Sequence, residues 1–258
     1  MPEGDTVWRQ ARLLRDALVG LELTSTDFRV PRFATVDLSG RVVDSVDSRG
    51  KHLLVRAGDA VIHSHLKMEG IWDVYPAGAR WRKPAWKARV ILRNEQVDAV
   101  GFELGKLEVI ARDDEHDALG YLGPDLLGPD WDAAEAVTRL GASPEAEVIV
   151  ALAEQRNLAG LGNVYVNELC FLRGIRPDRP VADVDLPALV DLARRVIVAN
   201  RDRPERVTTG DLRRGRRLWV YGRGGEACLR CGTTIQRGEF GRSALELRVT
   251  YWCPSCQT

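Results

Sequence analysis

The sequence predicts an α+β protein of two domains, and three observations support this prediction. One helical pattern at the start is followed by eight short segments rich in Val, Ile and Leu, which end near residue 111. Beyond about residue 131 the apolar residues recur with the spacing of helices. Two Cys-x2-Cys pairs close the chain. We therefore expect an N-terminal helix-flanked antiparallel β-sandwich and a C-terminal helical domain that carries a four-cysteine zinc finger.

The first helix is expected over residues 6–18. Val7, Ala11, Leu14 and Leu18 fall on one face of it, polar residues precede it as a cap, and Gly20 ends it. The strands that follow are separated by Gly, Pro, Asp and Asn. They are expected at 21–30, 41–48, 52–56, 60–65, 71–74, 88–92, 97–102 and 107–111. So many short strands in succession indicate an antiparallel sandwich or barrel.

An acidic segment rich in Gly and Pro, residues 113–131, interrupts this pattern and is read as a linker. Helices are then expected at 133–140, 145–154, 163–171 and 186–200. The predicted domain bounds are 1–115 for the β-sandwich, 116–130 for the linker, 131–218 for the helical domain and 219–258 for the finger.

Composition places the chain among ordinary soluble proteins. Of its 258 residues, 45% are hydrophobic and 29% are charged, and no apolar run approaches the roughly 18 residues of a membrane span. The start lacks a secretory pattern, so we expect a reducing cytoplasm and no disulfides. The net charge is zero, but residues 194–248 contain 14 Arg against 6 Asp and Glu. That excess indicates a basic face for a polyanion. The alternative is a solvated face without a partner.

The strongest single motif is the cysteine quartet. Cys228 and Cys231 form one pair, Cys253 and Cys256 form the other, and 21 residues separate the pairs. Two such knuckles complete a tetrahedral site, and four protein ligands leave no open position, so we expect one structural Zn²⁺. Cys170 lies among apolar residues and is expected in the core.

The first three residues offer an unusual nucleophile. Removal of Met1 would expose the ring nitrogen of Pro2 as a free secondary amine, with the carboxylate of Glu3 beside it. An α-amino group titrates near 8, so roughly a tenth of it is uncharged at neutral pH, far more than for a lysine. An iminium formed by a secondary amine is a persistent electron sink. The alternative is a plain start codon followed by a harmless proline.

Four further segments carry candidate functional residues. A turn with two glycines precedes Asn163 at a helix start, which is typical of a phosphate site. Lys51 lies between strands, where a lysine is usually only solvated. His63 and His65 alternate on a strand, but no third metal ligand is evident nearby. Met68 lies in a plausible turn that could carry an exposed apolar tip, although composition alone favours core packing.

Together these motifs resemble the formamidopyrimidine-DNA glycosylase/endonuclease VIII family of base-excision repair, over the whole chain. The matching segments are Met-Pro-Glu-Gly-Asp-Thr at 1–6, Gly-Lys-His-Leu-Leu at 50–54, His-Leu-Lys-Met-Glu-Gly at 65–70, Leu-Gly-Pro-Asp-Leu-Leu at 122–127, Ala-Gly-Leu-Gly-Asn-Val-Tyr-Val-Asn-Glu at 159–168, Val-Tyr-Gly-Arg at 220–223 and the finger. The first of these segments resembles the endonuclease VIII branch, and the sequence as a whole resembles the actinobacterial members of that branch. The resemblance implies a helix–two-turn–helix element in the second domain, and damaged DNA bound between the domains.

The resemblance also implies catalytic roles. Pro2 would attack C1′ of the damaged nucleotide, and Glu3 would act as general acid for ring opening and base departure. Lys51 would assist β-elimination, and Arg248 would hold a phosphate and assist δ-elimination. The expected enzyme is a bifunctional DNA glycosylase and AP lyase. It is expected to act as a monomer on duplex or single-stranded DNA.

The DNA-binding residues implied by the resemblance are Asn163, His65 and Arg248 at phosphates, and Met68 as the wedge that fills the gap left by a flipped base. The chain departs from its purine-directed relatives in one loop. Glu103 stands where they have an arginine that probes the opposite base, and Leu104 replaces an aromatic wedge. This departure favours oxidised pyrimidines over 8-oxoguanine. Alternatives are a non-catalytic damage sensor on the same scaffold and, more remotely, a zinc-ribbon RNA-binding protein.

Overall fold

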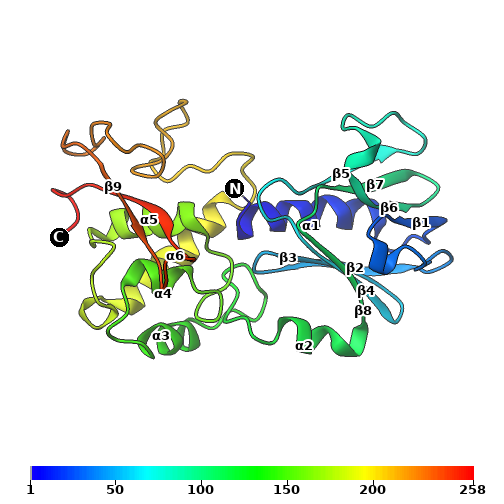
Figure 1. Ribbon diagram of the computed structural model, residues 1–258, viewed down its shortest axis with the longest axis horizontal. Helices are drawn as coiled ribbons and strands as arrows, with labels where there is room; N and C mark the ends of the chain where they lie inside the picture. Colours follow the sequence, from blue (N-terminus) through cyan, green and yellow to red (C-terminus); the bar gives the residue numbers. More distant parts are fainter. Residues whose placement is uncertain (1) are drawn as a thin grey trace. The chain divides into compact units, whose positions relative to one another are not determined.

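The computed structural model describes residues 2–258 and divides into two compact units, Met1–Tyr121 and Leu122–Thr258 (Figure 1). The predicted α+β class with antiparallel sheets is confirmed. The predicted loss of Met1 concerns a residue outside the described range. None of the helices formed by the described residues combines the length and the apolar character that a membrane crossing requires.

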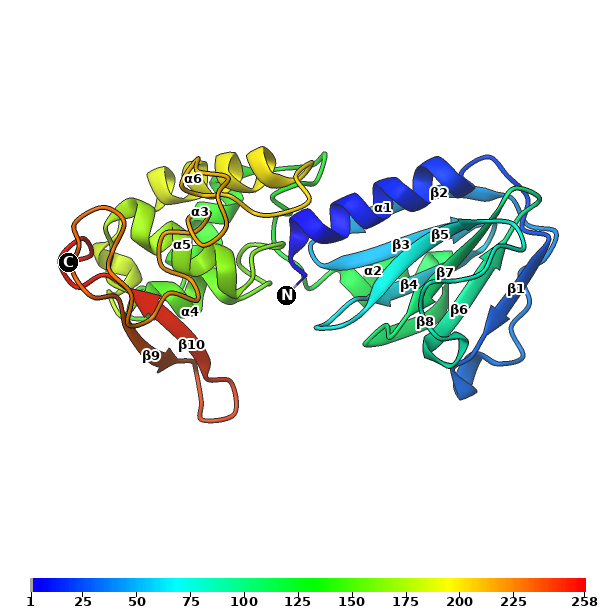
Figure 2. The same cartoon turned by 90° about the horizontal axis from the view of Figure 1, so that it is seen from above.

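Helix α1, Gly4–Leu18, opens the first unit. Glu3 is its N-cap in an extended conformation, and the Glu3 carbonyl accepts hydrogen bonds from the N–H groups of Thr6 and Val7. The four apolar residues predicted to share one face are all buried. They pack α1 chiefly against β2, as Figure 2 shows. The N-terminal end of the helix is therefore fixed to the sheet by a hydrophobic stripe.

Two four-stranded antiparallel sheets form the sandwich. One has the order β1 (Ser25–Phe28), β6 (Ala88–Arg93), β7 (Val97–Phe102) and β5 (Ile71–Pro76). The other has the order β2 (Val43–Arg49), β3 (His52–Ala57), β4 (Ala60–His65) and β8 (Lys106–Ala111). The inner faces enclose one hydrophobic core, in which Trp72 is fully buried and donates its indole N–H to Ser64 Oγ at 3.2 Å.

The strand predicted over residues 21–30 is shorter in the structure, where only Ser25–Phe28 is regular. The reason is that this segment pairs with two different partners. Leu23 donates its N–H to the Arg41 carbonyl near β2, whereas Thr24 donates its N–H to the Arg93 carbonyl of β6. The chain thus crosses from one sheet to the other within two residues, which a local alternation pattern does not reveal.

The acidic segment predicted to be irregular contains a 3-10 turn, Arg112–Asp114, and a short helix α2, Glu115–Leu119. The Glu115 carboxylate accepts two hydrogen bonds from the Arg56 guanidinium of β3, one of them 2.7 Å long from Nε to Oε2. Leu119 is buried. This contact ties α2 to the outer face of the β2–β3–β4–β8 sheet. Two further 3-10 turns, Pro31–Phe33 and Ala85–Lys87, precede β2 and β6.

The second unit contains the helices α3 (Ala133–Gly141), α4 (Val148–Ala153), α5 (Asn163–Arg173) and α6 (Leu186–Asn200), with a 3-10 turn at Val181–Asp183. Helix α4 begins later than the predicted residue 145. The backbone before it pairs instead with residues 179–182, because the Val181 N–H bonds to the Ala146 carbonyl and the Ala182 N–H bonds to the Pro144 carbonyl. A turn at residues 155–157 and an irregular stretch up to residue 162 separate α4 from α5.

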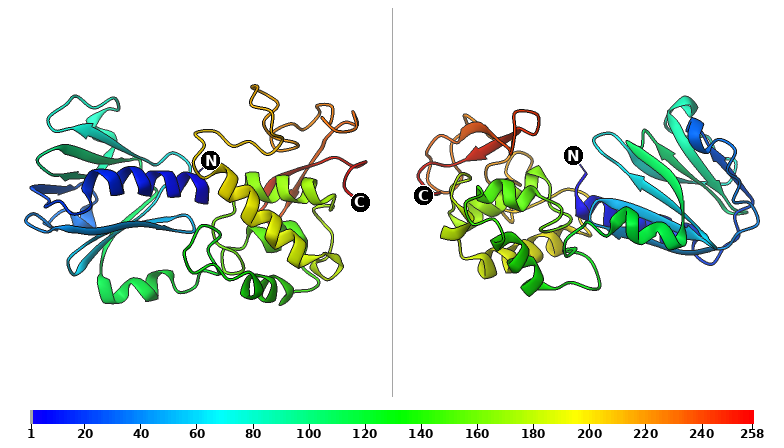
Figure 3. Two further views of the ribbon diagram at one scale, coloured as in Figure 1. Left: turned by 180° about the vertical axis from the view of Figure 1, so that it is seen from behind. Right: turned by 60° about the horizontal axis from the view of Figure 1, so that its bottom comes forward.

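A hairpin of β9 (Gln236–Phe240) and β10 (Arg248–Trp252) belongs to the finger, and β10 lies beside α5 (Figures 2 and 3). The asparagine amides of α5 hold it there. Asn163 Nδ2 donates to the Val249 carbonyl at 2.7 Å, and Asn167 Oδ1 accepts the Tyr251 N–H at 2.6 Å. Both asparagines are buried, so these bonds also satisfy groups that burial would otherwise destabilise.

Glu168 of α5 is fully buried and organises the segment that leads into the finger. Its carboxylate accepts the backbone N–H groups of Trp219, Val220 and Tyr221 at 2.8, 2.9 and 2.9 Å, and it also accepts the Thr208 hydroxyl. Burial raises the pKa of Glu168, and these hydrogen bonds oppose the rise because they favour the ionised carboxylate.

We expect Glu168→Gln to lower the free energy of unfolding of this unit by about 1–3 kcal/mol, because an amide NH₂ would face backbone donors that then lack an acceptor. Urea unfolding followed by tryptophan fluorescence would measure the change. Glu239→Gln, at an exposed position of β9, is the matched control and should leave the unfolding midpoint unchanged. Equal midpoints for both variants would contradict the organising role of the carboxylate.

Candidate active site and nucleic-acid interface

Pro2 and Glu3 lie at the N-terminus of α1. Pro2 is half-buried immediately before the helix, and the Glu3 side chain is fully buried. The backbone N–H groups of a first helical turn create a positive potential, which stabilises a carboxylate or a bound anion at this position. A buried acid beside the position of the predicted amine is therefore present in the structure. Their catalytic roles remain predictions.

Lys51 is in the two-residue turn of the β2–β3 hairpin, between the paired residues Arg49 and His52. Gly50, the first residue of the turn, has φ = 57°, and Lys51 has no positive φ. That sequence of conformations fits a type II′ turn, whose first position favours glycine. The turn and the start of α1 lie at the same end of the sandwich (Figures 1 and 2). Pro2, Glu3 and Lys51 thus belong to one end of the first unit.

A chain of hydrogen bonds runs beneath this hairpin, on the outer face of its sheet. Tyr121 Oη lies 3.1 Å from His52 Nε2, His52 Nδ1 lies 2.7 Å from His63 Nε2, and His63 Nδ1 lies 2.7 Å from Glu108 Oε1. A carboxylate only accepts, so His63 donates from Nδ1 and accepts at Nε2. His52 consequently donates from Nδ1 and accepts the tyrosine hydroxyl at Nε2. Both imidazoles are satisfied in the neutral form.

These hydrogen bonds bear on whether the alternating histidines could bind a metal ion. Both ring nitrogens of His63 are occupied by hydrogen bonds, so His63 and His65 do not form a metal pair. Among the described residues, the four finger cysteines are the only cluster suited to a metal ion. Burial lowers the pKa of His52 to about 3 and that of His65 to about 4, and nearby positive side chains add to both shifts.

The turn after β4 carries two more predicted residues. His65 Nδ1 accepts the Lys67 N–H at 2.9 Å, and Lys67 adopts a left-handed conformation with φ = 55°. Gly70 is required here, because a Cβ atom would come within 2.4 Å of the Leu66 carbonyl oxygen. Met68 is 66% exposed at this turn, so the core packing that composition suggests for it is wrong. The exposed side chain suits the predicted wedge, which remains a prediction.

The loop between β7 and β8 contains the predicted departure. Glu103, at φ = 50°, accepts ion pairs from Lys83 at 3.0 Å and Lys87 at 2.5 Å. These two lysines lower the pKa of Glu103. Leu104 is 7% exposed and packs in the core against Gly101. Leu104 therefore presents no wedge at the surface, and the Glu103 carboxylate is already bound by lysines.

In the second unit, Asn163 and Arg248 line one cavity, together with Glu154, Arg242 and Thr250. Arg248 begins β10 opposite Phe240 and is exposed. The Asn163 side chain bonds to the carbonyl of the residue that follows Arg248. Arg242 is ion-paired to Glu154 at 2.6 Å. The structure thus brings together two residues 85 positions apart that were both predicted to bind phosphate.

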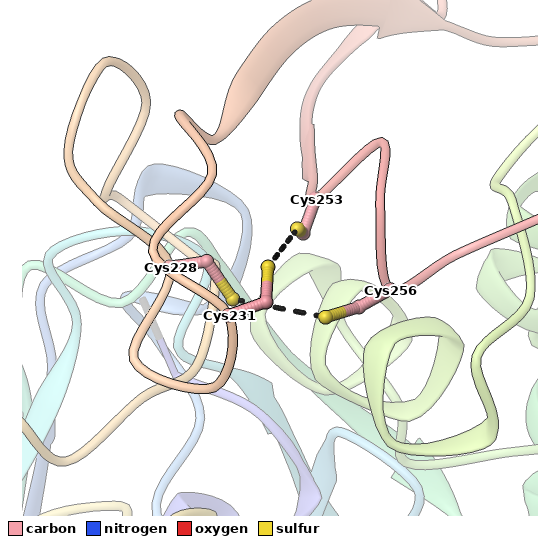
Figure 4. Close-up of side chains that lie close together, drawn as sticks. All are labelled: Cys228, Cys231, Cys253 and Cys256. Carbon is pink, nitrogen blue, oxygen red and sulfur yellow. Dashed lines mark hydrogen bonds between the residues drawn. The ribbon is translucent and has the colours of Figure 1, made fainter.

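The four cysteine sulfurs converge, as Figure 4 shows. The Cys228 and Cys256 sulfurs are 4.0 Å apart, those of Cys231 and Cys253 are 3.4 Å apart, and all four lie within 4.8 Å of one another. A tetrahedral ion with Zn–S bonds of about 2.3 Å places its sulfurs about 3.8 Å apart. The donor set and its spacing therefore fit a Zn²⁺ ion, so this cluster could hold a metal.

Comparison with known proteins identifies the family. Residues 1–106 match the formamidopyrimidine-DNA glycosylase N-terminal domain. The chain is 53% identical, over its whole length and 99% of the relative, to the DNA-(apurinic or apyrimidinic site) lyase Nei2 of Mycolicibacterium smegmatis. It is 52% identical over both full lengths to endonuclease 8 2 of Mycobacterium bovis. The chain belongs to the formamidopyrimidine-DNA glycosylase/endonuclease VIII family.

Solved structures of this family support the fold. A complex of the Lactococcus lactis formamidopyrimidine-DNA glycosylase with DNA containing an abasic site matches with a TM-score of 0.81 and 26% identity, over 100% of both chains. MutM in complex with carbocyclic 8-oxo-G containing DNA also gives a TM-score of 0.81, with 27% identity over both full chains. The predicted family and the predicted fold class are both confirmed.

The roles of several residues in these sites were not predicted from the sequence. His52, Glu108 and Tyr121 were not expected to join His63, because strand pairing and α2 bring them together only in three dimensions. The signal was the register: His63 faces Glu108 directly across β4 and β8. Glu168 and Asn167 were part of a recognised motif, but nothing local shows which backbone groups they hold.

We expect the first unit to lose stability as the pH falls below about 6.5. The unfolded chain binds protons at its histidines below that pH, whereas folded His52 and His65, with pKa values of about 3 and 4, do not. Each histidine that stays neutral in the folded state then lowers the free energy of unfolding by about 1.4 kcal/mol for each unit by which the pH falls. Urea unfolding at pH 7, 6 and 5 would measure it.

His52→Gln should flatten this pH dependence, because it removes one of the histidines that stay neutral in the folded state. His116→Gln is the matched control, since the fourth histidine of the chain is exposed on α2. A pH slope that is unchanged by His52→Gln, or is equally reduced by both variants, would refute the assignment of neutral buried histidines.

Proposed function

We propose that this protein is a base-excision-repair enzyme that removes oxidised bases, with a preference for pyrimidines, and cleaves the resulting abasic strand by β,δ-elimination. The observation that carries the proposal is full-length similarity, at 53% identity, to a relative named DNA-(apurinic or apyrimidinic site) lyase. The half-buried Pro2, the buried Glu3 and the neighbouring Lys51 turn support it. They supply a nucleophile, an acid and a second amine at one end of the sandwich.

In this mechanism the Pro2 nitrogen, free once Met1 is removed, attacks C1′ of the lesion. Glu3 donates a proton for ring opening as the base departs, which leaves an iminium between Pro2 and C1′. The iminium acidifies the C2′ proton, Lys51 assists its removal, and the 3′ phosphate leaves by elimination. A second elimination releases the 5′ side. The nucleotide must be outside the base stack for an amine to reach C1′.

In the second unit we assign Asn163 and Arg248 to phosphate binding. The hydrogen bond from Asn163 to the backbone of β10 fixes the strand that begins with Arg248. An arginine on a rigid hairpin can offer two parallel N–H groups to a phosphate without a large loss of side-chain entropy. His65 and Met68 are assigned to a phosphate contact and to the space of the extruded base. The enzyme is proposed to act as a monomer in the cytoplasm.

The lesion preference rests on the β7–β8 loop. Glu103 is held by two lysines and Leu104 is buried, so this loop offers neither a free cation nor an exposed ring to the opposite strand. Recognition of the base opposite 8-oxoguanine by such groups is therefore weakened. We propose oxidised pyrimidines, such as thymine glycol and dihydrouracil, as the better substrates.

We further propose that the cysteine cluster binds one Zn²⁺ ion, which would supply a rigid cross-link and no chemistry. The ion would be held by Cys228, Cys231, Cys253 and Cys256. Gln257 is fully buried beside them, and it donates to the Ile175 carbonyl after α5 at 2.8 Å. The metal would thus fix the end of the chain against α5, close to the strand that positions Arg248.

Sodium borohydride should trap the enzyme on DNA that contains an abasic site, because reduction converts the iminium into a stable amine. We expect peptide mapping to place the adduct on Pro2 and Pro2→Ala to lose it. Lys51→Gln should still form the adduct, but strand nicking should fall roughly 10²–10⁴-fold, as for the loss of a general acid or base.

The alternative functions give different results in the same experiment. A protein with intact DNA binding and no adduct is a damage sensor, and intact mass then shows whether a retained Met1 blocks the amine. An adduct mapped to Lys51 would overturn the Pro2 assignment. A preference for RNA, with salt-sensitive affinity and no cleavage, would indicate a zinc-ribbon RNA-binding protein.

Elemental analysis should find one zinc per chain. Cys253→Ser should lose the metal and weaken DNA binding, because the hairpin that carries Arg248 loses its cross-link. Cys170→Ser, which changes a cysteine buried within α5, is the control for zinc content, since it lies outside the cluster. A Cys253→Ser protein that keeps its fold and its DNA affinity would refute a structural role for the finger metal.

A further inference from the structure

The loop between β5 and β6 combines cations with tryptophans and has no assigned role. Residues 77–89 contain Arg80, Arg82, Lys83, Lys87 and Arg89, together with two tryptophans and no acidic residue. The loop projects from the β1–β6–β7–β5 sheet (Figure 1). Residues 79–85 line a hollow on it. A segment with this composition, in a chain whose net charge is zero, differs from a solvated face of mixed charge.

The loop is held in place by its first tryptophan. The Trp81 ring packs edge-on against Phe102, with 5.9 Å between centroids, and its N–H donates to Asp98 at 3.3 Å. The Arg29 guanidinium covers the Trp81 ring at 6.0 Å and donates to the Ala85 carbonyl at 2.8 Å. A loop fixed by such contacts loses little conformational entropy when it binds a partner.

The second tryptophan is exposed to solvent. Trp86 is 80% exposed, although it lies in the 3-10 turn Ala85–Lys87 within the same fixed loop. The Lys87 ammonium lies 5.2 Å from the centroid of the Trp86 ring, while it also pairs with Glu103. The lysine therefore supports the ring from a position that is itself fixed. The result is an aromatic platform presented to solvent by a rigid loop.

The charge around this platform remains positive. Glu103 neutralises one of its two lysine partners, and Asp73 pairs with Arg82, whose side chain is 78% exposed. Arg80 is exposed and forms no ion pair within the described part of the chain. An exposed aromatic ring bordered by cations suits a partner that offers both flat rings and negative charge. Single-stranded nucleic acid has both, whereas paired bases cover their faces with their neighbours.

We propose that residues 80–87 form a binding site for single-stranded DNA, in which Trp86 stacks on one unpaired base and the Arg80 and Arg82 guanidinium groups contact the flanking phosphates. A protein that belongs to a DNA-repair family meets such DNA wherever a strand is open. The inference rests on this loop alone and does not depend on the assignment of Pro2 or on any cleavage. It can therefore hold or fail separately from the proposed reaction.

Fluorescence anisotropy with labelled DNA would test it. One oligonucleotide with a central tetrahydrofuran, an abasic analogue that cannot form the iminium, is used alone and paired with its complement. We expect Trp86→Ala to weaken binding of the single strand about 5- to 100-fold, as for the loss of one stacked base, and binding of the duplex much less. Trp86→Phe should restore most of the affinity, and Trp86→Leu should not.

Two arginine variants test the phosphate contacts. Arg82→Ala should reduce the salt dependence of single-strand binding by about one released ion. Arg112→Ala is the matched control, because Arg112 is likewise exposed and paired with an aspartate, Asp44, but lies beyond the far end of β8. The control should bind as the wild type does.

Three results would overturn the proposal. Wild-type affinity of Trp86→Ala for the single strand, or an equal loss of affinity for single strand and duplex, would mean that no unpaired base is stacked there. Wild-type binding of the single strand by Trp86→Leu would show that an apolar surface is enough and that no aromatic ring stacks on a base. Thermal unfolding of each variant verifies that the fold is intact, as expected for an exposed side chain.

Discussion

The place of Arg248 depends on two hydrogen bonds between asparagine side chains of α5 and the backbone of β10. Asn163 and Asn167 are both buried, and a buried amide without a partner is costly. The pairing therefore admits one register of the strand against the helix. The side-chain Nδ2 of Asn167 also donates to the backbone carbonyl of Asn163 at 2.7 Å, so the two residues hold each other as well as the hairpin. These buried hydrogen bonds therefore determine the position of the exposed Arg248.

The same reasoning applies to the first unit, where Tyr121 and Glu108 flank the buried His52 and His63 in a chain of donors and acceptors. Each bond has one possible direction once Glu108 is ionised, and Lys106 at 2.7 Å helps to keep it so. The chain links three adjacent strands and the segment after α2, beneath the end of the sheet where the Lys51 turn lies. In both units, buried polar groups that satisfy one another determine where the exposed functional residues lie.

The sequence predicted the parts whose cause is local. The spacing of Cys228, Cys231, Cys253 and Cys256 is enough to predict one metal cluster, and the stripe on α1 is enough to predict its buried face. The exposure of Met68 was not predictable, because it follows from a turn that requires glycine at position 70. Neither was the division of residues 21–30 between two sheets, since that depends on partners 18 and 69 residues away.

Glu103 is the acidic residue of the β7–β8 loop, but its ion pairs leave the surrounding surface positive. The Glu103 carboxylate lies between Lys83 and Lys87, and those three side chains together carry one net positive charge. The cations of this surface lie in the β5–β6 loop, and the exposed ring beside them is Trp86, whereas Leu104 is buried. An acidic residue at position 103 therefore serves to bind the neighbouring basic loop. The two loops form one surface, and its charge toward a phosphate backbone remains positive.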